Sequence, residues 1–203
     1  RVQGEIGGGT RAAAGAHRLV HLLQKQQLQD LPAFLADARR EHQLEFINLL
    51  GPDGELRANE FGLVPEGGPM PLLVADASGA LASVAVIPAE ALLRIAPALR
   101  DRLGIPLVAT QNAAPSGRER EERAMVLIAR APIHDAEGRL LGHLQGGVLL
   151  NRNLPFIDHL NEIVYPEGAL PAGSQGTATL FLEDVRISTN VRLFESSRGE
   201  RAI

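Results

Sequence analysis

The segment AMVLIARAPIHDAEGRLLGHLQGGVLL, residues 124–150, decides the fold that the sequence predicts. Apolar residues dominate 124–133 and 139–150, and the polar, glycine-containing group DAEG lies between them at 135–138. A short polar group of this kind between two long apolar runs is typical of a turn between antiparallel strands. We therefore expect a long β-hairpin at the centre of the domain.

Further strands are expected on the N-terminal side of this hairpin. Residues 45–50 (EFINLL) precede the tight-turn sequence GPDG at 51–54, and a second short strand follows at 55–59. One more strand is expected at 81–87, and residues 105–110 are a candidate for another. Together with the central hairpin, they predict an antiparallel sheet of about five strands.

Helices are expected from apolar periodicity and from the prolines and glycines at segment ends. A long N-terminal helix begins at Thr10, after a glycine-rich segment at 4–9 that we expect to be frayed. The polar residues 111–122 predict a mobile loop. Helices mixed with one antiparallel sheet make an α+β fold. The other expected helices are 32–43, 72–77, 88–103 and 155–164.

Composition excludes several classes of function. The chain has 203 residues, a formal charge of −4, 3% aromatic residues and no cysteine. This composition does not indicate a concentrated basic face or aromatic side chains for stacking on bases. We therefore expect no nucleic-acid partner. Disulfides and thiolate metal sites are excluded. No transmembrane helix or signal peptide is visible, and we expect the chain to be a fragment whose flanking membrane segments lie outside it.

Two stretches resemble a known family. Residues 131–153 (APIHDAEGRLLGHLQGGVLLNRN) are similar to the final hairpin of extracytoplasmic Cache domains, which are PAS-like sensors. Residues 176–203 (GTATLFLEDVRISTNVRLFESSRGERAI) are similar to the start of the membrane-proximal unit in double-Cache receptors. The two stretches cover about a quarter of the chain.

The resemblance implies a domain organisation and a cellular context. It divides the chain into N-terminal helices (1–44), a PAS-like sensor unit (45–153) and a connecting helix with the opening hairpin of a proximal unit (154–203). It implies a periplasmic sensor of a membrane-anchored receptor, whose output is a histidine kinase, a chemoreceptor or a cyclic-dinucleotide enzyme. It also implies a homodimer formed through the long N-terminal helix. The aromatic and acidic residues that hold amino acids in well-known members are not recognisable here.

Three polar residues on the central hairpin are candidate ligand contacts. Arg130 alternates with apolar residues on its strand, and His143 and Gln145 do so on the next strand. If these residues share a face that lines a pocket, Arg130 is suited to pair with a small carboxylate. The alternative for Arg130 is a strand-edge residue that faces solvent or pairs with a local Asp or Glu. The alternative for His143 and Gln145 is the solvent side of a half-exposed sheet.

Arg57, Asn59 and Gln111 are further candidates. Arg57 and Asn59 end the first hairpin beside a Gly- and Pro-rich loop, and Gln111 follows a short strand. In PAS-like sensors the segments beyond this hairpin cover the pocket, which would place these side chains near a ligand. Ordinary turn and strand-end polarity is the alternative explanation.

No residue set indicates catalysis, a metal or a cofactor. His17 and His21 share a helix face, but Arg18 stands where a zinc-protease motif would have Glu. No nucleophile–base pair or phosphate loop is found, so we expect that the chain is not an enzyme. Two alternatives to a small-molecule sensor remain open: a dimerisation or interaction module without a ligand, and a cytoplasmic PAS-like regulatory domain.

Overall fold

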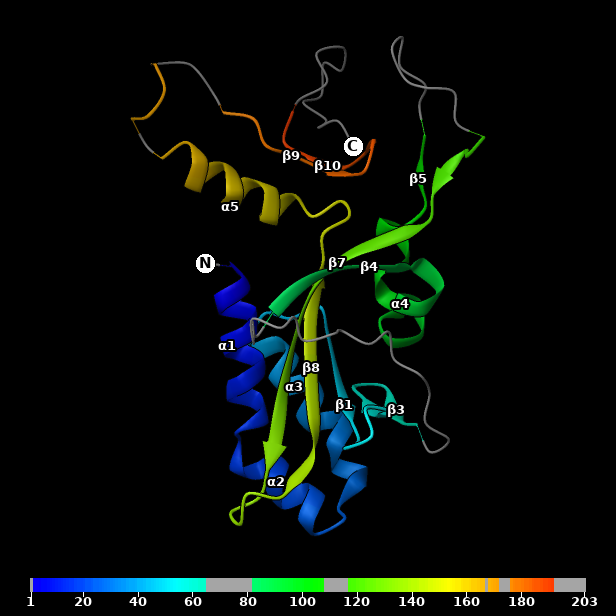
Figure 1. Cartoon of the computed structure of the whole chain (residues 1–203), viewed down its shortest axis with the longest axis vertical. Helices are drawn as coiled ribbons and strands as arrows, with labels where there is room; N and C mark the ends of the chain where they lie inside the picture. The colour runs from blue at the N-terminus through cyan, green and yellow to red at the C-terminus, as the bar shows by residue number, and fades with distance from the viewer. Residues whose placement is uncertain (1, 65–81, 108–116, 167, 172–175, 192–203) are drawn as a thin grey trace.

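The computed structural model describes residues 2–64, 82–107, 117–166, 168–171 and 176–191, and it has the predicted α+β fold (Figure 1). The helical elements are α1 (Val2–Ala14), α2 (His17–Gln24), η1 (Leu28–Asp30), α3 (Leu31–Glu41), α4 (Ala89–Ile95), η2 (Pro97–Arg102) and α5 (Leu154–Val164), where η marks a 3₁₀ turn. The strands are β1 (Phe46–Leu50), β2 (Leu56–Asn59), β3 (Gly62–Leu63), β4 (Ala82–Pro88), β5 (Ile105–Pro106), β6 (Arg120–Glu121), β7 (Arg123–His134), β8 (Leu140–Leu149), β9 (Thr179–Leu182) and β10 (Val185–Thr189).

The main sheet has six strands in the order β3-β2-β1-β8-β7-β4, and every pairing is antiparallel. The central hairpin is confirmed as β7 and β8, which turn at the predicted place. β1 pairs with β8, so the two predicted hairpins meet at the middle of the sheet. The sequence predicted about five strands because β3 has only two residues and carries no strand signal of its own.

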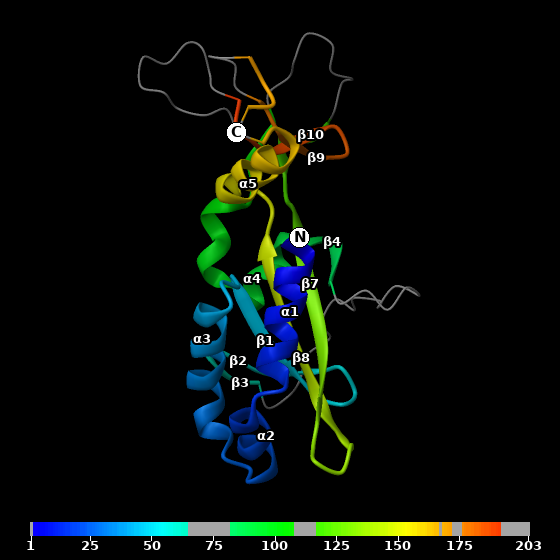
Figure 2. The same cartoon turned by 90° about the vertical axis from the view of Figure 1, so that its left-hand side faces the viewer.

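The N-terminal helices α1, α2 and α3 cover one face of the sheet (Figures 1 and 2). α1 runs through residues 4–9, so the expectation that this segment is frayed was wrong. Ile6, Thr10 and Ala13 lie on one side of α1 and are buried. Their burial offsets the low helix propensity of the glycines between them. The long N-terminal helix is divided, because α1 ends at Ala14 and α2 begins at His17.

The opposite face of the sheet is covered at one end by α4 and η2. The sequence predicted one helix over 88–103, but it is interrupted at Ala96. Pro97 explains the break, because proline disfavours helical geometry in the residue before it. The buried side chains on this face include Phe46, Leu50, Val126, Ile128 and Leu149 of the sheet and Leu92, Ile95 and Leu99 of the helical segments.

Arg102 links η2 to the end of β8. Its guanidinium pairs with Glu45 and donates to the carbonyls of Leu149 and Asn151, the latter at 3.0 Å. The second carboxylate oxygen of Glu45 accepts from the Leu149 N–H at 2.6 Å. This network fixes the end of β8 where the chain leaves the sheet.

β5 and β6 form a small sheet separate from the main one. β5 confirms only the first part of the strand predicted at 105–110, and it pairs with β6. β6 falls within residues 111–122, so the part of that segment at Arg120–Glu121 is a strand and not a loop. The helix predicted at 72–77 and residues 108–116 lie outside the described residues.

α5 and the β9–β10 hairpin lie beyond the end of the main sheet (Figure 1). The Asn153 side chain caps α5 by accepting from the Phe156 N–H at 3.0 Å. The Arg152 N–H donates to the Ile187 carbonyl at 2.7 Å, which joins the end of β8 to β10. Within the described ranges, no helix combines the length and apolarity that crossing a bilayer requires.

Candidate functional site

A row of polar side chains crosses the middle of the main sheet. Asn59 of β2 is opposite Asn48 of β1, Asn48 is opposite Gln145 of β8, and Gln145 is opposite Arg130 of β7. Residues directly opposite each other in antiparallel strands point to the same face. We call these four residues the polar row. At the usual strand spacing it is about 14 Å long.

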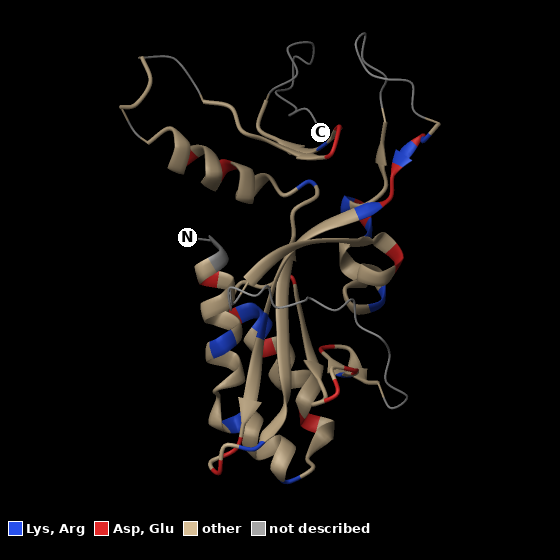
Figure 3. Ribbon diagram, in the orientation of Figure 1, with Lys and Arg blue, Asp and Glu red and all other residues tan. Residues whose placement is uncertain are grey.

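The polar row lies on the sheet face turned away from α1 and α3. Alternation along β1 places Phe46 and Leu50 on the same face as Asn48, and both belong to the core beneath α4 and η2. β1 and β8 contain no Asp, Glu, Lys or Arg. Figure 3 shows the charges on helices, on turns and on β6 with the start of β7. Arg130 of β7 is therefore a charged residue directly beside the uncharged strand β8.

Asn48 and Gln145 are buried with incomplete hydrogen bonding. They are 0% and 2% exposed, and Asn48 Nδ2 donates to Gln145 Oε1 at a long 3.4 Å. Asn48 Oδ1 is buried and has no partner. A buried acceptor left in this state costs about 1–3 kcal/mol, which only a hydrogen-bond donor could recover. The alternative that Gln145 faces solvent is therefore wrong.

Arg130 is half-buried and lacks an acidic partner within the described part of the chain. Its Nη2 lies 2.9 Å from His143 Nδ1, and its Nε is buried without a hydrogen-bond partner. Burial lowers the pKa of Arg130 from its ordinary value, but a guanidinium stays charged at physiological pH. The site therefore holds a positive charge with donor capacity to spare.

His143 lies between Arg130 and the turn of the first hairpin. Because a guanidinium only donates, Nδ1 of His143 accepts from Arg130 and the ring proton is on Nε2. Burial and, second, the Arg130 charge hold the pKa of His143 below its usual value, while a hydrogen bond to the Gly51 backbone acts in the opposite direction. His143 is therefore neutral around pH 7.

The structure places the remaining candidates differently. Asn59 is 6% exposed, and its Oδ1 accepts from the Phe61 N–H at 2.9 Å, so it also shapes the turn after β2. Arg57 pairs with Asp53 and Glu55 at the hairpin turn, so acidic side chains already match its charge. Gln111 lies outside the described residues.

Asn48 is the functional candidate that the sequence reasoning missed. It is a single polar residue inside the apolar strand FINLL, where Asn is uncommon because it packs poorly on a pleated surface. That signal alone marks an unusual position. It does not show that Asn48 faces Gln145, which is 97 residues away.

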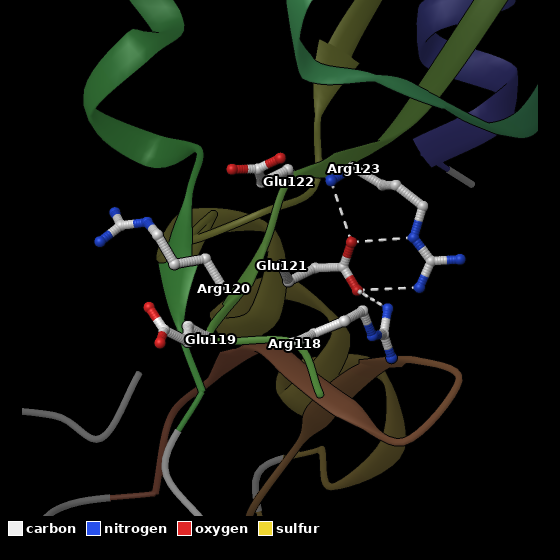
Figure 4. Close-up of a pocket in the computed structure, with 6 residues that line it drawn as sticks. All are labelled: Arg118, Glu119, Arg120, Glu121, Glu122 and Arg123. Atoms are coloured by element: carbon white, nitrogen blue, oxygen red, sulfur yellow. Dashed lines mark hydrogen bonds and ion pairs between the residues drawn. The ribbon is translucent and has the colours of Figure 1, made fainter. Parts of the chain in front are cut away.

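A separate charged hollow of about 630 Å³ is lined by Arg118, Glu119, Arg120, Glu121, Glu122 and Arg123 (Figure 4). None of these six residues belongs to the polar row. Arg123 binds both oxygens of Glu121 at 2.8 Å and also pairs with Glu183 of the β9–β10 turn.

The ion pairs at this hollow keep its carboxylates and guanidiniums charged. Bonds to Arg123 hold the pKa of Glu121 below its ordinary value, and Glu121 and Glu183 raise the pKa of Arg123. Arg118 adds contacts to Glu121 and Asp184. These carboxylates and guanidiniums satisfy one another, so the cluster joins β6 and β7 to the β9–β10 turn.

The described residues show no grouping suited to a metal. Among the described residues, no three His, Asp or Glu side chains converge as ligands. His17 and His21 both lie on α2 and are exposed.

Similar folds occur among solved structures, although no family model and no curated protein matches the sequence. The periplasmic domain of Vibrio cholerae LuxQ aligns with 92% of this chain and 71% of its own, at 13% identity and a TM-score of 0.51. A selenomethionine structure of the same domain aligns with 97% of this chain and 75% of its own, at 13% identity and a TM-score of 0.53. At this identity the likeness concerns the fold, and it confirms the PAS-like arrangement of helices on one antiparallel sheet.

Proposed function

We propose that this chain is the extracytoplasmic ligand-sensing domain of a bacterial transmembrane receptor, and that it binds a small anion, best a carboxylate, at the polar row. The fold shared with a periplasmic domain supports the location, and the two Cache-like stretches support the receptor context. The proposal gives the chain no catalytic step and no cofactor.

The observation that carries the proposal is the incomplete pairing of the polar row. Arg130 has a positive charge, and its buried Nε–H lacks an acceptor. A charged group half-buried beside uncharged strands is stabilised when it pairs with an opposite charge. A carboxylate supplies two acceptor oxygens in the geometry that a guanidinium fits.

The path from this site to the membrane-proximal part runs along β8. Gln145 lies on β8, and the same strand ends at Leu149, which Glu45 and Arg102 hold. Arg152 then bonds to β10. A ligand that bridges β7 and β8 would favour one arrangement of this connection over another, and such a bias is how binding shifts a two-state receptor.

A thermal-shift screen with small carboxylates, amino acids and amines tests the proposal. A carboxylate at a hundred times its Kd should stabilise the domain by about 2.7 kcal/mol, or about 5–10 °C in Tm. Amines without a carboxylate should give no shift. If no carboxylate raises the Tm at millimolar concentration, the anion-sensing function is wrong.

We also propose that the domain forms a homodimer through α1. Gly4 and Gly8 lie on the exposed side of α1, where an added Cβ would meet nothing within 4 Å. The side bearing Ile6, Thr10 and Ala13 is occupied by the sheet, so the glycine side is open to a second copy. Two-fold pairing of one surface is the commonest form of dimer.

Because the chain has no cysteine, a single introduced thiol reports on this contact. Gly8→Cys should give a disulfide-linked dimer under mild oxidation, detected by non-reducing electrophoresis. Ala136→Cys, on the exposed β7–β8 turn, is the matched control and should stay monomeric. Equal cross-linking of both variants would rule out pairing through α1.

A further inference from the structure

The hydrogen bond between Arg130 and His143 leaves no room for a proton on His143 Nδ1. Nη2 of Arg130 donates to that nitrogen at 2.9 Å. If Nδ1 carried a proton, two donors and two positive charges would face each other. The ligand-free site therefore favours the neutral form of His143.

An anion on Arg130 removes this conflict. A carboxylate offers acceptor oxygens to the guanidinium, which then no longer needs Nδ1 as an acceptor. The negative charge also offsets that of Arg130, so a positive imidazolium beside it is no longer opposed. Nδ1–H can then donate to the same anion.

We infer that the site binds an anion together with a proton. The anion replaces His143 Nδ1 as the acceptor for Arg130, and His143 takes up a proton from solvent on Nδ1. This proton stays on Nδ1, and the N–H donates a hydrogen bond to the bound anion. This inference rests on the proposed function, because it assigns a pH-dependent regulation to the same site. No covalent bond forms or breaks apart from the N–H bond on His143.

The surroundings of His143 permit this change. On β7 the facing ionisable groups are Arg130 and the more distant His134, and both oppose a charge on His143. The β1–β2 hairpin contributes the Gly51 backbone and, near its turn, Asp53, Glu55 and Arg57, of which Arg57 pairs with both carboxylates. β8 contributes no other charged side chain.

The direction of the pH effect follows from proton linkage. Burial and Arg130 hold the pKa of His143 below 6.5 in the free site, and the anion raises it in the complex. The complex then binds more protons than the free protein, so affinity rises as pH falls through the window between the two pKa values. Within that window the Kd changes by up to about tenfold per pH unit.

NMR titration of the histidine ring signals from about pH 5 to 8 tests the inference. The probe is pyruvate, whose carboxyl stays ionised throughout, at tens of millimolar. In wild type, the His143 pKa should lie below 6.5 without pyruvate and rise by about 1 with it. Arg130→Met should raise the His143 pKa without any ligand, since one like charge and one donor are lost. His134→Gln is the control and should keep the pyruvate effect.

The possible results distinguish a failure of proton uptake from a failure of anion binding. If pyruvate shifts the NMR signal of the Gln145 side-chain amide and leaves the His143 pKa unchanged, the site binds anions without proton uptake. In that case only the inference fails. If pyruvate shifts no signal of the polar row, the anion site itself is wrong. If Arg130→Met leaves the His143 pKa unchanged, the two residues are not coupled and the inference is overturned.

Discussion

Replacing Arg130 with Met should weaken the binding of small carboxylates by about 10- to 100-fold. This is the loss expected when a charge-assisted hydrogen-bonded pair is removed. The folded state should not suffer, because Met keeps the apolar stem and removes a half-buried guanidinium with a partnerless Nε. Calorimetric titration with the best carboxylate from the thermal screen measures the affinity, and urea unfolding measures the stability.

Arg94→Met provides the matched control for this prediction. Arg94 lies on α4 and is exposed, so its replacement removes the same charge from a position outside the polar row. Its affinity for the carboxylate should equal that of wild type. If Arg130→Met and Arg94→Met bind the ligand equally well, Arg130 is not the anion contact.

Replacing Gly147 with Ala should destabilise the domain by about 3 kcal/mol, which is typical of overpacking in a tightly packed core. An added Cβ would lie 2.5 Å from Phe46 Cζ and 2.6 Å from the Leu127 carbonyl oxygen. The Phe46 ring is buried, and the carbonyl belongs to the β7 backbone that pairs with Val148, so neither moves without cost. Urea unfolding monitored by circular dichroism gives the change directly.

Gly8→Ala is the control, and its expected effect on stability has the opposite sign. Its added Cβ meets nothing within 4 Å on the exposed side of α1, and Ala is the better helix former. This variant should therefore stabilise the domain by about 0.5–1 kcal/mol. If Gly147→Ala were as stable as wild type, the close packing of Phe46 against β8 would be incorrect.

The central hairpin and the alternation of Arg130, His143 and Gln145 were predictable because both are local properties of residues 124–150. Period-2 alternation is enough to place these side chains on one face. The polar row was not predictable, since it depends on the register of β1 against β8, which are distant in sequence. For Arg57, the strand was predictable but the direction of the side chain was not. The pairing of β1 with β2 is irregular next to Leu50, and the Arg57 side chain pairs with Asp53.

Helix α1 shows how tertiary packing overrides local propensity. Glycines at 4–9 indicate a frayed segment when only propensity is considered. In the fold, Gly146 lets Thr10 and Leu44 approach β8 so closely that an added Cβ would lie 2.8 Å from Thr10 Oγ1. This contact joins two segments more than a hundred residues apart, and no local pattern contains it.

A crystal structure of the domain soaked with the best-binding carboxylate tests the central claim most directly. We expect the carboxylate to lie within hydrogen-bond distance of the Arg130 guanidinium, and to accept a second hydrogen bond from His143 Nδ1–H or from the Gln145 side-chain amide. Ligand density away from the polar row, or an Arg130 fully paired with acidic residues of its own chain, would contradict the proposed site.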